Sequence, residues 1–245
     1  MPSMRFIENE DKFLGYSWSV YESYFSDKES FINQYNHIDS PEKKNSFLRL
    51  TSYYLFFVID GSYSSPKYDV EDLSFVDQTY KYVAIVALIE SMYGKNDYID
   101  FFQWIMRNKK NELFPIKTPQ EASKLYASYK AEYGNTLNIV KFFQSLDDSI
   151  KLFVQRSLVV LDDSGKTGEL EEKEESIEAL AKLLYQIRSD YVHGAELVLE
   201  FDPAMVLSVR DKKPISCSIE LKHVCRIFES GLLQHFGIVP DKRQI

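Results

Sequence analysis

The sequence predicts an all-α protein built as a multi-helix bundle, and three observations lead to this prediction. Apolar side chains recur at spacings of three and four residues through most of the chain, as in helices with one buried face. Ser-Pro at 40–41 and Thr-Pro at 118–119 have the form of helix starts. The segment 196–215 alternates polar and apolar residues, which allows a short β-hairpin there.

The N-terminal part is predicted to form a helical subdomain of its own. Ser40 is placed to cap a helix over 41–60, which is followed by the turn-rich segment GSYSSPKYD at 61–69. We therefore expect an N-terminal helical subdomain over 1–68 and a second helical domain over 69–245. The apolar stripe of the helix consists of Phe47, Leu50, Tyr54 and Phe57.

Three helical segments follow in the middle of the chain. The first runs over about 70–93 and can end at Gly94. The second begins with a capping box at Thr118 and reaches residue 134. The helical pattern then resumes over 138–160.

The last third contains a polar linker and two more predicted helices. The linker at 162–176 includes SGKTG, but Val160 stands where a phosphate-binding loop requires its first glycine, so we interpret it as a solvated loop. The helix after it packs against other helices or a second copy of the chain. An amphipathic helix over 220–238 closes the chain. The seam of the earlier helix consists of Ile177, Leu180, Leu184, Ile187 and Tyr191.

Composition excludes several classes of protein. A net charge of −8 argues against a broad basic field that coats nucleic acid, so any such contact must be local. Cys217 and Cys225 lack the spacing of a metal site, and we expect reduced thiols, no metal and no cofactor. The acidic residues within 1–13 do not suit a signal peptide, and the apolar run 53–59 is too short to span a membrane. We therefore expect a soluble cytoplasmic protein.

The stretch QIRSDYVHGAE contains the strongest candidates for chemistry, Arg188 and His193. On an ideal helix their side chains point about 140° apart and lie about 7.5 Å apart along the axis. They converge if Arg188 bends over its own turn, or if the helix loosens before Gly194. The alternative is that Arg188 pairs with an acid such as Asp190 or Glu196, while His193 lies at the negative end of the helix.

Two segments resemble the HEPN superfamily, and its Apea-like branch in particular. LLYQIRSDYVHGAE, residues 183–196, is similar to the signature helix, in which Arg is followed after four to six residues by His. YKYVAIVALIESMYG, residues 80–94, resembles the early helix of the branch, with Glu90 at its centre. The resemblance covers about residues 75–236 and implies a HEPN-type helical bundle, with the aromatic N-terminal segment as an addition.

The resemblance implies a metal-independent endoribonuclease. In that chemistry the 2′-OH of RNA attacks the adjacent phosphate and expels the 5′-oxygen, which leaves a 2′,3′-cyclic phosphate and a 5′-hydroxyl. His193 would transfer protons, and Arg188 would stabilise the extra charge on the phosphate. A homodimer through the helix 177–193 would supply these groups from two protomers.

Further residues have supporting roles under this interpretation. Ser189 would orient Arg188 or the phosphate, and Asp190 is a second candidate beside it. Tyr191 could stack on a base. Glu90 would hold Arg188 in place by an ion pair.

The residues leave the biological role open. HEPN proteins that are paired with nucleotidyltransferase antitoxins carry a Tyr two positions after the His, whereas this chain has Ala195. We expect a toxin or antiviral-defence endoribonuclease that acts on RNA, with an antitoxin or regulatory protein as a further partner. The alternatives are a non-catalytic HEPN module that binds RNA, a nucleotide or a protein, and a helical interaction protein in which the motif is a coincidence.

Overall fold

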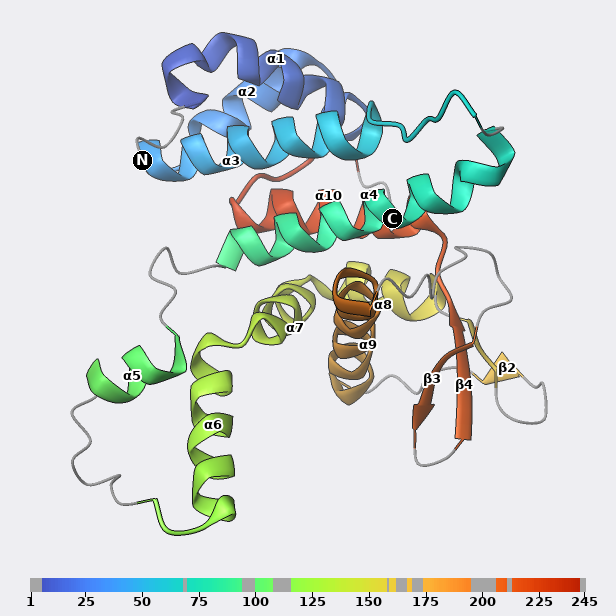
Figure 1. The fold of residues 1–245 in the computed structure, drawn as a ribbon. Helices are drawn as coiled ribbons and strands as arrows, with labels where there is room; N and C mark the ends of the chain where they lie inside the picture. The colour runs from blue at the N-terminus through green and yellow to red at the C-terminus, as the bar shows by residue number, and fades with distance from the viewer. Residues whose placement is uncertain are drawn as a thin grey trace.

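Helices form the body of the molecule, as the sequence predicts. A computed structural model describes residues 6–67, 70–93, 100–107, 116–157, 159–161, 167–168, 174–194, 206–210 and 213–242. Figure 1 shows the N-terminal helices as an upper layer, α4 and α10 beneath them, and α7, α8 and α9 below. A small sheet lies to one side, and α5 and α6 project to the other. The fold is therefore an all-α bundle with short β-strands appended.

The upper layer comes from the aromatic N-terminal segment. Ser40 caps α3 as predicted, since its hydroxyl accepts a hydrogen bond from the amide of Lys43 at 3.2 Å. α3 then continues into one wider, π-helical turn, in which the amide of Asp60 donates to the carbonyl of Leu55 at 2.8 Å. The elements are η1 (Phe6–Asn9), α1 (Glu10–Tyr21), η2 (Glu22–Tyr24), α2 (Lys28–Asn36), α3 (Pro41–Tyr54) and η3 (Leu55–Ile59).

The second layer consists of α4 (Val70–Tyr93) and α10 (Leu221–His235). Tyr54 of α3 packs on Phe228 of α10, with ring centroids 4.8 Å apart, and both side chains are fully buried. The apolar core therefore continues from the N-terminal helices into the rest of the chain. The boundary predicted at residue 68 falls beside the loop 61–67 between η3 and α4.

The helix predicted over 138–160 is wrong as a single element. The chain forms α7 (Asn135–Ser145) and α8 (Asp148–Ser157) with a break between them. Asp147 makes the break, because its carboxylate caps the amide of Ile150 at 2.9 Å. Its own amide donates to the side chain of Gln234 on α10 at 2.9 Å, so a contact distant in sequence supports the break.

A hairpin forms close to the predicted place. Strands β3 (Val206–Arg210) and β4 (Lys213–Ser218) pair antiparallel, while 195–205 lie outside the described residues. β4 also pairs with β1 (Val159–Leu161), where the sequence predicts the end of a helix. β1 pairs in turn with β2 (Thr167–Gly168), which gives the strand order β2-β1-β4-β3. Gly94 also lies outside the described residues.

The remaining elements are α5 (Phe101–Arg107), α6 (Pro119–Tyr133) and α9 (Glu174–Gly194). Thr118 caps α6 as predicted, and Glu121 reaches back to the residue before the cap instead of to the cap itself. Thr118 accepts from the amide of Glu121 at 3.2 Å, and the Glu121 carboxylate accepts from the amide of Lys117 at 2.8 Å. Within the described residues, none of the helices has the length and apolar character needed to cross a bilayer.

Candidate functional site

Helix α9 carries the signature residues and is held by the helices around it. Its apolar side packs chiefly against α7 and also contacts α4 and α8. The hydroxyl of Tyr82 on α4 donates to the carbonyl of Leu184, which fastens the two helices together. Ile177, Leu184 and Ile187 of the predicted seam are only 3–4% exposed within one chain. These three side chains are therefore not available to a second protomer.

Arg188 forms the predicted ion pair with Glu90. One guanidinium nitrogen lies 3.4 Å from Oε2 of Glu90, and the two side chains are only 18% and 16% exposed. The guanidinium also lies 6.0 Å from the ring of Tyr185. Burial raises the pKa of Glu90, and Arg188 opposes this rise without cancelling it. The ion pair therefore does not fully compensate for removing the carboxylate from water.

Both partners keep unused hydrogen-bonding capacity. Nε of Arg188 and Oε1 of Glu90 are buried and have no hydrogen-bond partner among the described residues. An arginine side chain with an unused N–H can donate a hydrogen bond to a further anionic group when the local packing opens. Glu90 thus holds Arg188 in a defined position and leaves part of the guanidinium unsatisfied.

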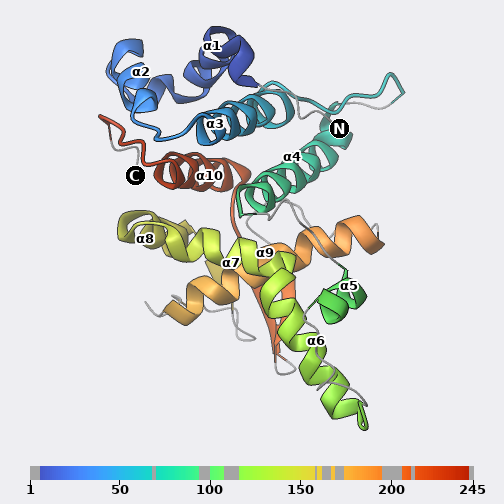
Figure 2. The same cartoon turned by 90° about the vertical axis from the view of Figure 1, so that its left-hand side faces the viewer.

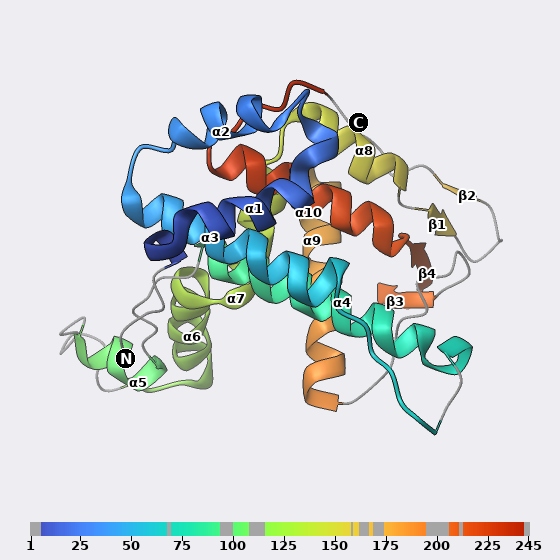
Figure 3. The same cartoon turned by 90° about the horizontal axis from the view of Figure 1, so that it is seen from above.

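His193 lies in the last turn of α9 and is exposed, unlike Arg188. α9 remains helical through Gly194, its last residue, so the helix does not loosen before His193. His193 and Val192 are exposed, whereas Arg188 is directed toward α4. Because α9 is helical across both positions, the two side chains leave it in directions about 140° apart. Figure 3 shows the C-terminal end of α9 emerging past α4.

Three tyrosines, which we call the tyrosine group, gather beside the end of α9. Tyr63 and Tyr80 stack with ring centroids 5.5 Å apart, and Tyr191 meets Tyr80 edge-on at 6.0 Å. Burial, followed by a hydrogen bond to Tyr80, raises the pKa of Tyr191. Asp77 positions the loop that carries Tyr63 by accepting from its amide at 2.7 Å. Tyr63 and Tyr80 remain 46% and 50% exposed and can receive a further planar ring.

The structure thus brings together some of the predicted residues and separates others. Glu90 meets Arg188, and Tyr191 joins an exposed aromatic group. Ser189 is half-buried, and the side chain of Asp190 is outside the described residues. No motif in the sequence marks Tyr63 or Tyr80, because the contact between them depends on how the loop 61–67 folds back on α4.

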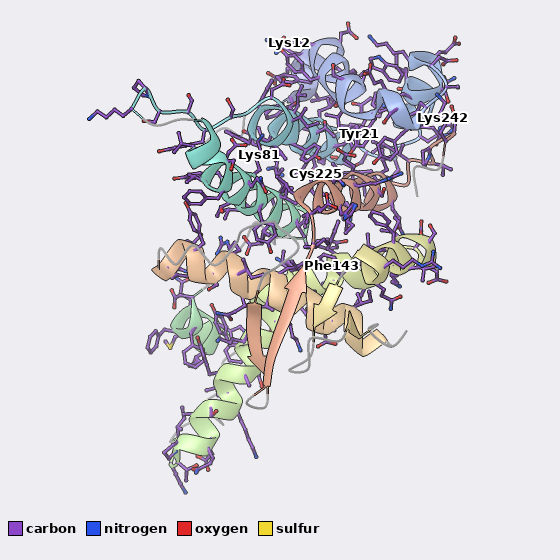
Figure 4. All side chains as sticks on the ribbon, turned by 90° about the vertical axis from the view of Figure 1, so that its right-hand side faces the viewer. Lys12, Tyr21, Lys81, Phe143, Cys225 and Lys242 are labelled. Carbon is purple, nitrogen blue, oxygen red and sulfur yellow. The ribbon has the colours of Figure 1, made fainter. Side chains whose placement is uncertain are left out.

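A second polar cluster lies away from α9, between α10 and the N-terminal helices. The hydroxyls of Tyr24 and Tyr54 donate to the two oxygens of Glu229 at 2.7 and 2.6 Å. The cluster borders a cavity of about 350 Å³ that is also lined by Cys225. Burial raises the pKa of Glu229 and raises that of the free thiol of Cys225 to about 11. Figure 4 shows Tyr21 and Cys225 at this interface.

The described residues offer no donor set for a metal ion. Across those residues, no three His, Cys, Asp or Glu side chains gather closely enough to bind one. The side chain of Cys217, the other cysteine, belongs to the part of the chain that is not described. The chemistry available at α9 is therefore that of a guanidinium, an imidazole, a carboxylate and aromatic rings.

No family model, curated protein or solved structure is significantly similar to this chain.

Proposed function

We propose that the protein is a metal-independent endoribonuclease of HEPN type, which acts as a homodimer. The observation that carries the proposal is the end of α9. It presents an exposed imidazole, His193, two positions after Tyr191 of the tyrosine group, while Glu90 positions Arg188 on the same helix. An imidazole in contact with water can exchange protons with a substrate near neutral pH.

The reaction needs only groups that the chain and the RNA supply. His193 takes the proton of the 2′-OH as this oxygen attacks the neighbouring phosphorus, or donates a proton to the departing 5′-oxygen. The guanidinium of Arg188 stabilises the additional negative charge on the phosphate in the transition state. The tyrosine group offers a ring for an unpaired base, which would keep the backbone in place. A 2′,3′-cyclic phosphate and a 5′-hydroxyl result.

A second protomer is part of the proposal because of the helix geometry. Arg188 and His193 of one chain point in different directions along α9, so one phosphate cannot meet both without a large rearrangement. Arg188 of one protomer and His193 of its partner could meet at one phosphate if the exposed ends of two α9 helices pair. The phosphate would then compete with Glu90 for the guanidinium.

The test is cleavage of an end-labelled structured RNA in EDTA. We expect cyclic phosphate ends, and we expect Arg188→Ala or His193→Ala to abolish cleavage. The matched controls are His37→Ala and Arg156→Ala, which alter exposed residues just after α2 and on α8 and should leave the rate unchanged. Replacing the 2′-OH at the cleaved nucleotide by hydrogen should also stop the reaction.

Mixing the two inactive variants tests the composite site. If Arg188 and His193 act across the dimer, the mixture should regain part of the activity, because a mixed dimer contains one intact pair. Cleavage that persists in the His193→Ala variant, or a stable monomer at micromolar concentration by sedimentation, would argue against the proposal.

The ion pair between Glu90 and Arg188 favours a second candidate function, a non-catalytic HEPN module that binds RNA, a nucleotide or a protein. Glu90 already occupies the guanidinium, and the protein is acidic overall. In that case the labelled RNA would bind without being cut. A toxin or antiviral-defence role, restrained by an antitoxin or regulatory protein, belongs to the first proposal and would be tested by growth arrest on expression.

A further inference from the structure

The two helices α5 and α6, which we call the arm, stand apart from the bundle. Figure 2 shows α6 extending away from the body with α5 beside it. The arm has a small core of its own, separate from the main one. Trp104 of α5 donates from Nε1 to the carboxylate of Glu132 on α6 at 3.0 Å, which ties the two helices together. The core consists of Trp104, Ile105 and Tyr129, with Phe101 and Leu125 packed against them.

Large apolar side chains remain on the outside of the arm. Phe102 is 75% exposed, Met106 77% and Tyr126 45%, and the first two lie one helical turn apart on α5. Along α6, every described side chain is exposed except those of Leu125 and Tyr129. Exposed rings gathered on a projecting element mark an interaction surface, because single-chain packing does not cover them.

The charge of the arm is opposite to that of the rest of the protein. Residues 100–133, which comprise the two helices and the sequence between them, include six basic and four acidic residues, in a chain with a net charge of −8. Lys117, Lys124 and Lys130 are exposed, and none of them forms a salt bridge with a described residue. The ammonium of Lys130 lies 4.9 Å from the ring centroid of Tyr126.

The described acidic residues of the arm are already engaged with protein donors. Asp100 accepts from the amide of Gln103 at 2.9 Å, at the start of α5. Glu121 accepts from the amide of Lys117, and Glu132 accepts from the indole of Trp104. At helix N-termini the exposed amides partly offset the charge of Asp100 and Glu121. The lysines therefore determine the field around the exposed rings.

We propose that the arm binds single-stranded RNA, with bases stacked on Phe102 and Tyr126 and phosphates held by the lysines of α6. Rings interleaved with basic side chains suit a single strand, because every base offers a flat face and every nucleotide a charge. Figure 3 shows the arm and the C-terminal end of α9 on the same side of the molecule, so one strand can approach both. This inference rests on the proposed function in one respect: it names single-stranded RNA as the substrate of the site at the end of α9.

Binding is measured with a fluorescent uridine oligonucleotide whose 2′-hydroxyls are methylated, so that it cannot be cut. Phe102→Ala and Tyr126→Ala should each weaken binding by about fivefold or more, the effect of losing one stacked base. Phe57→Ala removes a ring that is 59% exposed on η3 and should have no effect. Lys124→Gln should reduce the slope of log affinity against log salt by about 0.7, whereas Lys28→Gln on α2 should not.

The outcomes distinguish this inference from the proposed endoribonuclease. If the arm variants bind and cut as well as wild type, the arm inference fails and the nuclease stands. If RNA binds through Phe102 but is never cut, the arm inference stands and the nuclease fails. An oligonucleotide that does not bind overturns the arm inference. The arm inference is also overturned if Phe102→Ala leaves the RNA affinity unchanged and instead dissociates a dimer. The same holds if this variant leaves the RNA affinity unchanged and loses binding to anionic vesicles.

Discussion

Replacing Arg188 by Met tests the environment that the structure assigns to Glu90. The two side chains are only 18% and 16% exposed, and one contact of 3.4 Å joins them. Met retains the apolar part of the arginine stem and removes the charge. Glu90 is then left as a mostly buried carboxylate without its partner.

The expected loss of unfolding free energy at pH 7 is about 2 kcal/mol. Removing one member of a fully buried pair costs about 3–5 kcal/mol, and we reduce this because both side chains keep some exposure and share one long contact. A loss of this size lowers the Tm by about 4–8 °C in a protein of this length. Burial already raises the pKa of Glu90 above its ordinary value of 4.5, and losing Arg188 raises it further.

The sign of the pH dependence follows from this rise in pKa. A carboxyl group with a raised folded-state pKa binds its proton more tightly in the folded state, so stability falls as the pH rises through that range. The deficit of Arg188→Met relative to wild type should therefore be full at pH 7 and shrink as the pH falls toward 4.5.

Urea unfolding at pH 7 and pH 5 measures the effect. Lys182→Met is the matched control, because its pair with Glu178 has side chains 58% and 41% exposed and should contribute at most about 0.5 kcal/mol. Adding Glu90→Gln to Arg188→Met should recover most of the loss, since the buried charge is gone. An equal cost of Arg188→Met with Glu or Gln at position 90, or a cost that does not change between pH 7 and pH 5, would refute this reasoning.

Further predictions concern α10 and the residues that pack on it. Tyr54→Phe removes the hydrogen bond to Glu229 and should cost about 2 kcal/mol in urea unfolding, because a charged acceptor loses its donor; an unchanged midpoint would contradict the contact. Glu229→Gln should gain stability relative to wild type as the pH rises above 4.5, because burial raises the pKa of the native carboxyl; a difference that is constant with pH would be the contrary result. Gly231→Ala places a methyl group against the ring of Phe142 and should cost about 1–3 kcal/mol by calorimetry, whereas Gly15→Ala, with open space around it, should not lower the Tm.

Local features of the fold could be predicted because their causes are local. The starts of α3 and α6 depend on a hydroxyl that accepts an amide hydrogen bond a few residues later, and both are where the sequence predicts them. The break between α7 and α8 has only part of its cause nearby in the sequence, the cap that Asp147 places on the amide of Ile150. It is stabilised by Gln234, a residue of α10 that lies far along the chain from Asp147. Strand β1 is a similar case, since it is paired with β4, which lies far along the chain, as well as with β2.

For the candidate site, too, some features follow from the local sequence and others depend on tertiary packing. The sequence by itself determined the residue types and their spacing on one helix, Arg188 and His193, and the resemblance added Glu90 as a partner. The tertiary structure alone decided that Arg188 is directed inward to Glu90, that His193 is exposed, and that Tyr63 and Tyr80 lie beside Tyr191. Helical spacing sets the relative directions of side chains, whereas their burial and partners depend on which other elements pack there, and that information is distributed over the whole chain.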